Sequence, residues 1–293
     1  MSVITVFTPT YNRAYCLDAV YKSLCRQTEQ NFIWLIIDDG STDNTKALVE
    51  SWAGENKITI QYHYKENGGM HTGHNLAYQL IETELNVCID SDDYMPDDAV
   101  ENIIAIWNKN KSDKYAGILG LDCYKDGTIV STKKFPENVK SGKYSLLKSK
   151  YGIVRDIKFV YATAVVKKYP QYPVFKGEKF VPLGYTYSNI DRDYDMLFLN
   201  KVLCVVEYMP DGSTLNIFRQ YYKNPKGFAY SRRQSLTGLY NLKEKFVIAV
   251  HLVAESILAG ENAFRGNSEK LLTFFAIPLG VALYGYILWL NRK

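Results

Sequence analysis

The chain has 293 residues, a formal net charge of +4 and 47% hydrophobic residues, enough apolar material for one large domain with a substantial appendage. This composition excludes an intrinsically disordered chain. The five cysteines are dispersed without any C-x-x-C spacing, and no secretory signal precedes the apolar run near the N-terminus. We therefore expect reduced thiols and a cytoplasmic protein rather than a secreted disulfide scaffold.

Apolar runs alternate with helical patterns over positions 1–110. The predicted strands are Val3 to Phe7, Phe32 to Ile37, Ile58 to Tyr64 and Leu85 to Ile89. Helices are predicted after them, ending near Arg26, Trp52 and Ile81, with a further helix beginning at Pro96. This alternation predicts an α/β fold with a doubly wound, mostly parallel, Rossmann-like sheet. No G-x-G-x-x-G follows the first strand, which argues against a dinucleotide dehydrogenase.

An acidic stretch, Asp90-Ser91-Asp92-Asp93, ends the fourth predicted strand. Ligands of open α/β sheets bind beyond the carboxyl ends of the strands, so Asp90 and Asp92 are predicted to face the binding crevice. Two carboxylates this close repel each other unless a cation or a proton lies between them. Mg²⁺ or Mn²⁺, held by one or two carboxylates and the phosphates of a ligand, would supply that cation. The alternative is a solvated turn before the next helix, with Asp93 as its cap.

Four motifs in this order resemble the signature series of family 2 glycosyltransferases with the GT-A fold, of the type that makes bacterial capsule and surface polysaccharides. They are Thr8-Pro9-Thr10-Tyr11-Asn12-Arg13, Asp38-Asp39-Gly40-Ser41-Thr42-Asp43, Asn67-Gly68-Gly69 before His74-Asn75, and Asp90-Ser91-Asp92-Asp93 with Pro96. The resemblance is close over about the first 110 residues. It implies a nucleotide-sugar donor, a divalent metal and inversion at the anomeric carbon. It also implies a catalytic domain over residues 1–218, with a nucleotide-sugar half (1–110) and an acceptor half (111–218).

The resemblance implies roles for individual residues. Asp39 would accept a hydrogen bond from the base, which suits a carboxylate because it selects bases that carry a ring N–H. Asp92 would bind the metal directly, and Asp90 would lie near the ribose and the metal. The other expected donor-binding residues are Thr8, Pro9, Tyr11, Arg13, Gly68, His74 and Ser91. Helix capping is the alternative role of such acidic residues, and we assign it to Asp38 and Asp43 but not to Asp39.

Two positions depart from the family pattern. His74 stands where the family often has Arg, and Leu183 stands where similar sequences often have Glu. His71 and His74 form an H-x-x-H pair, but no further zinc ligand lies nearby in the sequence, so we expect them to line the pocket or cap a helix. The departures leave open a competing class, a non-catalytic GT-A-like module that binds a nucleotide or a partner without transfer.

The general base is expected after the sheet core, where the family uses an acidic residue to take the proton from the acceptor hydroxyl. Glu178 follows Gly177 in a loop flanked by aromatic residues and is the first candidate, with an ion pair to a neighbouring lysine as the alternative. Asp191 is the second candidate, although the run Asp191-Arg192-Asp193 is typical of a solvated helix face. Further along the chain, Ala116 to Val130 is strand-like with a hairpin turn at Asp126-Gly127, and Phe159 to Val166 is another apolar run. Val202 to Tyr208 is predicted as a closing strand before a turn over 209–213.

Residues 219–293 are basic, with 11 Lys and Arg against 4 Asp and Glu, which leaves 24 against 27 in residues 1–218. This asymmetry predicts an anionic surface or a phosphate-bearing partner for the tail. The stretch from Arg219 to Arg233 interleaves basic and aromatic residues, but no recognised nucleic-acid-binding fold accompanies it, so no nucleic-acid partner is expected.

Two helices are predicted at the end of the chain. Lys243 to Ala259 is amphipathic, with an apolar face formed by Phe246, Val247, Val250, Val253, Ala254 and Ile257. Leu271 to Leu290 carries no charge and reaches the length of about 20 apolar residues that a spanning helix needs, although Pro278 and two glycines interrupt it. We expect a helical, membrane-associating region over 219–293, attached peripherally or monotopically at the inner face of the cell membrane. Packing on the catalytic domain or a homodimer seam are the alternatives.

Together with these observations, the resemblance implies an inverting, metal-dependent glycosyltransferase. It would move a single sugar from a nucleoside-diphosphate sugar, with a UDP-sugar as the expected donor, to a hydroxyl of a lipid-linked surface-glycan acceptor. A processive synthase is disfavoured, because the sequence has neither a Q-x-x-R-W motif nor several spanning segments.

Overall fold

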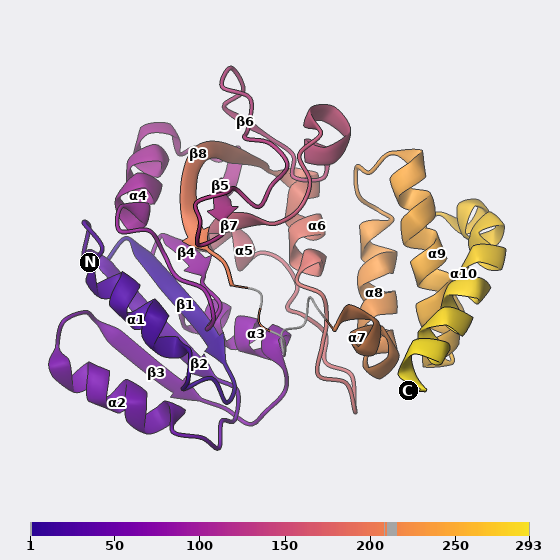
Figure 1. Ribbon diagram of the computed structural model, residues 1–293. Helices are drawn as coiled ribbons and strands as arrows, with labels where there is room; N and C mark the ends of the chain where they lie inside the picture. Colours follow the sequence, from indigo (N-terminus) through magenta and orange to yellow (C-terminus); the bar gives the residue numbers. More distant parts are fainter. Residues whose placement is uncertain (1, 208, 210–215, 293) are drawn as a thin grey trace. The chain divides into compact units, whose positions relative to one another are not determined.

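The computed structural model describes residues 2–207, 209 and 216–292 (Figure 1). The strands are β1 (Ile4–Thr10), β2 (Phe32–Asp38), β3 (Ile60–Tyr64), β4 (Leu85–Cys88), β5 (Tyr115–Cys123), β6 (Ser141–Gly142), β7 (Ile157–Ala162) and β8 (Asp195–Val205). The helices are α1 (Leu17–Cys25), α2 (Thr45–Glu55), α3 (Met70–Leu80), α4 (Ala99–Asn110), the π-helix η1 (Leu147–Tyr151), α5 (Thr163–Val166), α6 (Gly184–Asp193), α7 (Ile217–Lys223), α8 (Pro225–Ser235), α9 (Leu242–Ala259) and α10 (Lys270–Asn291). The turn expected over 209–213 lies almost wholly outside the described residues.

The chain divides into two compact units. The first unit comprises residues 1–169 and 194–207, and the second comprises residues 170–193 and 208–293. The second unit therefore takes in α6 as well as the helices that follow residue 216. The functional division expected at residue 218, into a catalytic and a membrane-associating region, stays a prediction.

The first unit holds one eight-stranded sheet in the order β3-β2-β1-β4-β7-β5-β8-β6. The first four strands are mutually parallel, and β5 is parallel to β8, whereas β7 and β6 run antiparallel to their neighbours. The predicted doubly wound, mostly parallel sheet is thereby confirmed. The apolar run from Phe159 to Val166 is not one strand, because β7 ends at Ala162 and α5 follows it. A short apolar run fits a buried strand or a buried helix equally well.

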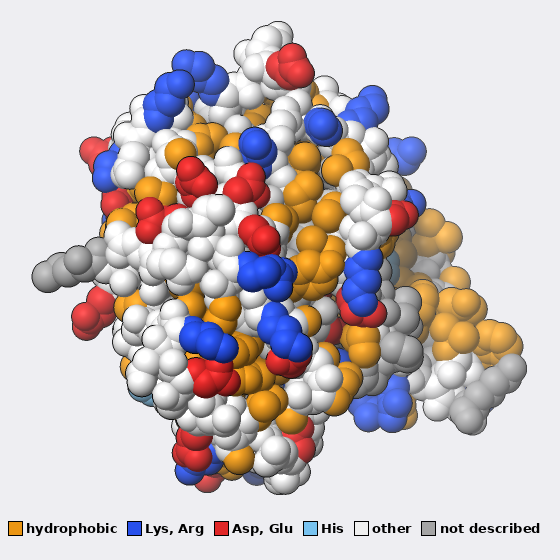
Figure 2. Space-filling model, turned by 60° about the vertical axis from the view of Figure 1, so that its left-hand side comes forward, with side chains coloured by type: hydrophobic (Ala, Val, Ile, Leu, Met, Phe, Trp, Pro, Cys, Tyr) orange, Lys and Arg blue, Asp and Glu red, His pale blue; other side chains and the backbone are white. Residues whose placement is uncertain are grey.

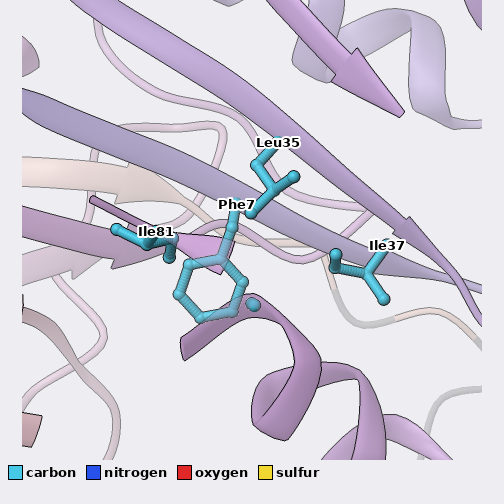
Figure 3. Packing of buried hydrophobic residues seen from close by; sticks show 5 residues of the cluster. Phe7, Leu35, Ile37 and Ile81 are labelled. Atoms are coloured by element: carbon cyan, nitrogen blue, oxygen red, sulfur yellow. The ribbon is translucent and has the colours of Figure 1, made fainter. Parts of the chain in front are cut away.

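Successive side chains of a strand point to opposite faces of the sheet, so a strand that is apolar throughout has two faces to bury. In the first unit, helices cover both of these faces. On one face, Trp34 of β2 packs against the rings of Tyr21 in α1 and Trp52 in α2. On the other face, buried residues of the sheet and α3 form one apolar cluster, which Figure 3 shows at close range. Its members are Phe7, Leu35, Ile37, Ala77 and Ile81. These two cores fix the strand ends from which the candidate site is built.

The second unit is helical. Its long helices α9 and α10 pack tightly, because a Cβ added at Gly280 of α10 would lie 2.5 Å from the side chain of Val253 in α9. α9 buries Ala249, Leu252, Val253, Ala254, Glu255 and Ser256. Of the predicted apolar face of this helix, Val253 and Ala254 are buried, whereas Val247 and Ile257 are exposed. Two partner helices, α8 and α10, pack on α9, so its buried face is set by both of them and includes Glu255, which pairs with Arg232 of α8 at 3.3 Å.

Pro278 lies inside α10, and the helix continues through it from Lys270 to Asn291. Its exposed face is apolar along its whole length, and Figure 2 shows hydrophobic side chains gathered at the right of the view with few charges among them. The large side chains exposed on α10 are Leu271, Phe274, Phe275, Leu279, Val281, Tyr286 and Trp289. Within the described residues, α10 is the one helix long and apolar enough to cross a membrane, judged by length and composition.

Candidate active site

The carboxyl ends of β2, β1 and β4 lie side by side at one edge of the sheet. Thr10 of β1 is in register with Asp38 of β2, and Phe7 of β1 with Cys88 of β4. The backbone N–H of Asp39 donates to the carbonyl of Thr10 at 2.8 Å. Three predicted motifs, which lie far apart in the sequence, are thus brought to the edge at which open α/β sheets bind their ligands.

Asp38 and Asp39 have different environments although they are adjacent. The Asp38 carboxylate accepts the Ser41 backbone N–H at 2.7 Å and the Tyr62 hydroxyl at 2.6 Å, so it holds the turn after β2. The Asp39 carboxylate accepts the backbone N–H groups of Gly68 and Gly69 at 2.9 and 2.7 Å and forms an ion pair with Lys65. Asp39 therefore ties the glycine turn before α3 to the end of β2.

The acidic turn after β4 meets a cation from the turn after β1. Asp92 Oδ2 lies 3.7 Å from Arg13 Nη1, which also donates to the Tyr15 hydroxyl at 2.6 Å. Asp90 Oδ1 accepts a weak hydrogen bond from the Cys88 thiol at 3.7 Å. Neither carboxylate is deeply buried.

The third carboxylate of this turn, Asp93, points inward. It accepts the backbone N–H of Glu207 at 3.1 Å and lies 4.0 Å from the ammonium group of Lys158 in β7. Burial raises the pKa of Asp93 to about 7, against the opposing charge of Lys158. The helix that follows begins at Ala99 with Asp98 at its N-cap position, so Asp93 is not its cap.

A metal site made only of protein ligands is absent from the described residues, where no three His, Cys, Asp or Glu side chains gather in a way that could hold an ion. Mg²⁺ and Mn²⁺ do not require such a cage, because they bind through one or two carboxylates together with phosphates and water. The hard oxygen atoms of Asp90 and Asp92 at the ligand-binding edge fit this type of site.

Other predicted donor-binding residues differ in accessibility. Thr8 is buried, and its hydroxyl accepts the indole N–H of Trp34 at 3.0 Å. Pro9 and Ser91 are also buried, whereas Tyr11 is 48% exposed. A Cβ added at Gly68 would lie 2.7 Å from the Thr72 hydroxyl, so a larger residue here would require the Thr72 side chain to move.

His74 is buried in the first unit with 1% exposure. Its ring meets the edge of Phe7 at a centroid distance of 5.0 Å, and Nε2 lies 3.6 Å from the Cys88 sulfur. Together with the Cys88 to Asp90 contact, this places the imidazole behind the acidic turn. His71 and His74 both lie in the first turns of α3 and are buried, and neither caps this helix, whose N-cap is Gly69 without a side-chain hydrogen bond; that they line the pocket stays a prediction.

The burial of His74 predicts an acid-sensitive fold. Burial lowers the pKa of His74 to about 4 from an ordinary value of 6.5. The stability gained from the neutral imidazole is present above pH 6.5 and is lost as pH falls toward 4, by about 3 kcal/mol. In urea unfolding between pH 7 and pH 4.5, His74→Gln is expected to lose less stability than the wild type. His63→Gln, at a half-buried position of β3, is the control, and equal pH slopes for wild type and His74→Gln would contradict the prediction.

The two candidate bases belong to the second unit. The Glu178 carboxylate accepts the backbone N–H groups of Lys226 and Gly227 at 3.0 and 2.8 Å, so it binds the first turn of α8, where helical N–H groups lack partners. The alternative role given to Glu178, an ion pair with a neighbouring lysine, is replaced among its contacts in the described residues by these two backbone N–H groups. Asp191 is 4% exposed on α6, so the expectation of a solvated face was wrong for this residue and holds for Arg192 and Asp193.

Lys65 and Lys158 are site residues that sequence reasoning missed. Lys65 directly follows β3 and precedes the Asn67-Gly68-Gly69 motif, which was a usable signal. Lys158 lies in β7, far from the acidic turn along the chain, and no local pattern connects the two. Only the sheet order, with β7 next to β4, brings Lys158 to Asp93.

A mostly parallel sheet with an Asp-x-Asp turn at its ligand-binding edge defines the architecture of GT-A glycosyltransferases. The chain belongs to the family described as Glycosyl transferase family 2, whose profile matches residues 5–165. It is 27% identical over 101 residues to the glycosyltransferase GlyG of Streptococcus pneumoniae, a match that covers 34% of each chain. It is 28% identical over 115 residues to the poly(ribitol-phosphate) beta-N-acetylglucosaminyltransferase TarS of Staphylococcus aureus, covering 39% of this chain and 20% of TarS.

Solved structures show the same fold. TarS residues 1–349 in complex with UDP-GlcNAc superpose with a TM-score of 0.63 at 19% identity, covering 96% of this chain and 81% of that one. The mannosyltransferase PcManGT of Pyrobaculum calidifontis, in complex with GDP-Man and Mn²⁺, gives a TM-score of 0.57 at 19% identity, covering 96% and 73%. The sequence matches span about a third of the length of GlyG and a fifth of the length of TarS.

Proposed function

We propose that the protein is an inverting, metal-dependent glycosyltransferase that moves one sugar from a nucleoside-diphosphate sugar to an acceptor hydroxyl. The observation that carries this proposal is the meeting of Asp90, Asp92 and Arg13 at the carboxyl edge of the sheet, next to the Asp39 turn. Carboxylates that hold a divalent ion and an arginine that binds phosphate are the groups that a diphosphate leaving group needs.

In this proposal Asp92, with Asp90 beside it, holds a divalent metal, Mn²⁺ or Mg²⁺. When bound, the ion supplies Lewis acidity that offsets charge on the departing diphosphate. Arg13 lies against Asp92 and can turn its guanidinium toward a phosphate, because Arg presents several N–H donors in one plane. Asp39 accepts the ring N–H of the base, and a carboxylate, Glu178 or Asp191, takes the proton of the acceptor hydroxyl.

The donor class is testable with a panel of sugar nucleotides. Release of nucleoside diphosphate from UDP-, GDP- and dTDP-sugars, with and without Mn²⁺, is expected for one base and only with metal. Binding without any release, with or without a saccharide acceptor, would favour the competing function, a non-catalytic GT-A-like module. Because a donor contact was expected at His74, the burial of this residue favours the non-catalytic alternative.

We further propose that the acceptor is a lipid-linked saccharide and that the protein attaches monotopically to the inner face of the cell membrane through α10. One face of this helix packs on α9 through Gly280, and near its end Asn291 bonds the Phe218 carbonyl of α7 at 3.3 Å. A helix held along one face by neighbouring helices of its own unit favours lying on a bilayer over crossing it. Tyr286 and Trp289, exposed near its end, are of the types enriched at membrane interfaces.

Substitutions on the exposed face of α10 test the membrane attachment. The triple variant Phe275→Ser, Leu279→Ser, Trp289→Ser is expected to lower binding to vesicles of anionic phospholipid by about 100-fold or more. Each substitution removes about 1.5 kcal/mol or more of the free energy gained when the apolar side chain is buried in the bilayer. Val174→Ser, at another exposed apolar position, is the control. Flotation measures the binding, and light scattering measures the oligomeric state. A wild-type protein that ignores vesicles and forms a dimer that the triple variant dissociates would refute the attachment and indicate a homodimer seam.

A further inference from the structure

Lys65 lies where the base of the donor is expected, and the sequence did not assign it a role. Its backbone N–H donates to the Asp38 carbonyl at 2.9 Å, which anchors the residue to the end of β2. Its ammonium group donates to Asp39 Oδ1 and to the Glu66 carbonyl. The Lys65 side chain is 20% exposed and that of Asp39 is 5% exposed, so the ion pair is held at the margin of the core with an opening to solvent.

The hydrogen-bonding capacity of this ion pair is not exhausted. An ammonium group has three N–H donors, and the third N–H of Lys65 has no partner among the described residues. Asp39 Oδ1 accepts two donors, whereas Oδ2 accepts only the Gly69 N–H, so Oδ2 retains a lone pair. A free acceptor and a free donor therefore lie on two side chains in direct contact.

The imidazole of His71 adds an independent sign that a polar ligand belongs here. His71 is 1% exposed, and neither of its ring nitrogens has a hydrogen-bond partner within the part of the chain that the structure describes. Burial lowers the pKa of His71 to about 4; the charge of Asp39 raises this pKa and the charge of Lys65 lowers it, both by less than burial, so the ring is neutral and lies near the ion pair. Buried polar atoms without partners are rare in folded proteins and are commonly satisfied by water or a ligand.

We propose that Lys65 is a specificity-determining residue that donates to a carbonyl of the donor's nucleobase, beside the ring N–H that Asp39 accepts. The proposal rests on the proposed function and deepens it by naming the class of base. Uracil and guanine present a ring N–H next to a carbonyl, which matches the acceptor of Asp39 and the donor of Lys65. Cytosine and adenine present a ring lone pair next to an amino group. In the same place, the lone pair would face the Asp39 carboxylate and the amino group would face the Lys65 ammonium group, and both contacts are unfavourable.

Calorimetry with UMP, CMP, GMP and AMP in the absence of metal tests this proposal. The wild type is expected to prefer the carbonyl base over the amino base of its ring size, UMP over CMP or GMP over AMP, by at least about 10-fold, in line with a hydrogen bond to a charged group. Lys65→Met should lower affinity for the preferred nucleotide by roughly 10- to 100-fold and leave the amino-base nucleotide nearly unchanged. Lys65→Arg should retain most of the preference. Lys57→Met, which removes an exposed lysine paired with Glu55, is the matched control.

A second measurement needs no variant and so does not depend on the folding of Lys65→Met. If UMP is preferred, 3-methyl-UMP, which lacks the ring N–H, and 4-thio-UMP, whose sulfur is a weak acceptor, should each bind the wild type at least about 10-fold more weakly than UMP. If GMP is preferred, 1-methyl-GMP and 6-thio-GMP take their places. Equal affinity for the parent and the thio analogue, an unchanged preference in Lys65→Met, or no mononucleotide binding by the wild type would overturn the assignment. Failure of sugar transfer with base selection intact would instead overturn the proposed function.

Discussion

Asp92→Asn is expected to abolish metal-dependent donor binding while the protein stays folded. Asparagine keeps the size of the side chain but removes the charge that a hard divalent ion requires. Substitution of a residue that only supports a metal ligand lowers metal affinity by about 10- to 100-fold. Loss of a direct ligand should therefore lower the affinity for the donor, measured in the presence of Mn²⁺, by at least about 100-fold. Calorimetry with a UDP-sugar, with and without Mn²⁺, measures the effect.

The control for Asp92→Asn is Asp97→Asn, because Asp97 pairs with Arg26 on the surface at 3.1 Å and takes no part in the site. Nucleoside monophosphate binding without metal should be similar in Asp92→Asn and wild type, since the base is bound elsewhere at the sheet edge. Unchanged Mn²⁺-dependent affinity in Asp92→Asn would show that its pairing with Arg13 is structural and that the metal proposal is wrong.

Glu178→Gln is expected to lower turnover by about 100-fold or more and to leave donor binding intact, if Glu178 is the general base. The structure adds a second consequence, because the same carboxylate accepts two N–H groups at the start of α8. An amide can accept only through its oxygen, so one helical N–H would face an NH₂ group and stability should fall by about 1–3 kcal/mol. Turnover must therefore be measured below the unfolding midpoint of the variant.

Asp191→Asn distinguishes the two candidate bases. Asp191 is buried on α6, and Asp193, exposed two positions later, provides the matched control Asp193→Asn. Transfer that persists in Glu178→Gln and disappears in Asp191→Asn would assign the base to Asp191. Full turnover in both variants would contradict a base from either position.

The sequence by itself determined the sheet and the positions of its functional motifs. Apolar runs ending at Thr8, Asp38 and Asp90 predict strand ends, and alternation with helices predicts a parallel sheet, so the motifs had to meet at one edge. These features are local: the identity of each strand and of the polar residue after it depends on neighbours a few positions away.

Only the tertiary structure decided which side chains at this edge are free to act. His74 occupies a position expected to contact the donor, but packing against Phe7 buries it, while Lys65 from the next strand along supplies a cation at Asp39. Glu178 could have been solvated or ion-paired, and it is held by the start of a helix much later in the chain. On α9 several apolar stripes were possible, and the helices that pack on it selected the one that is buried. In each case the local pattern allows more than one partner, and contacts between residues distant in sequence choose among them.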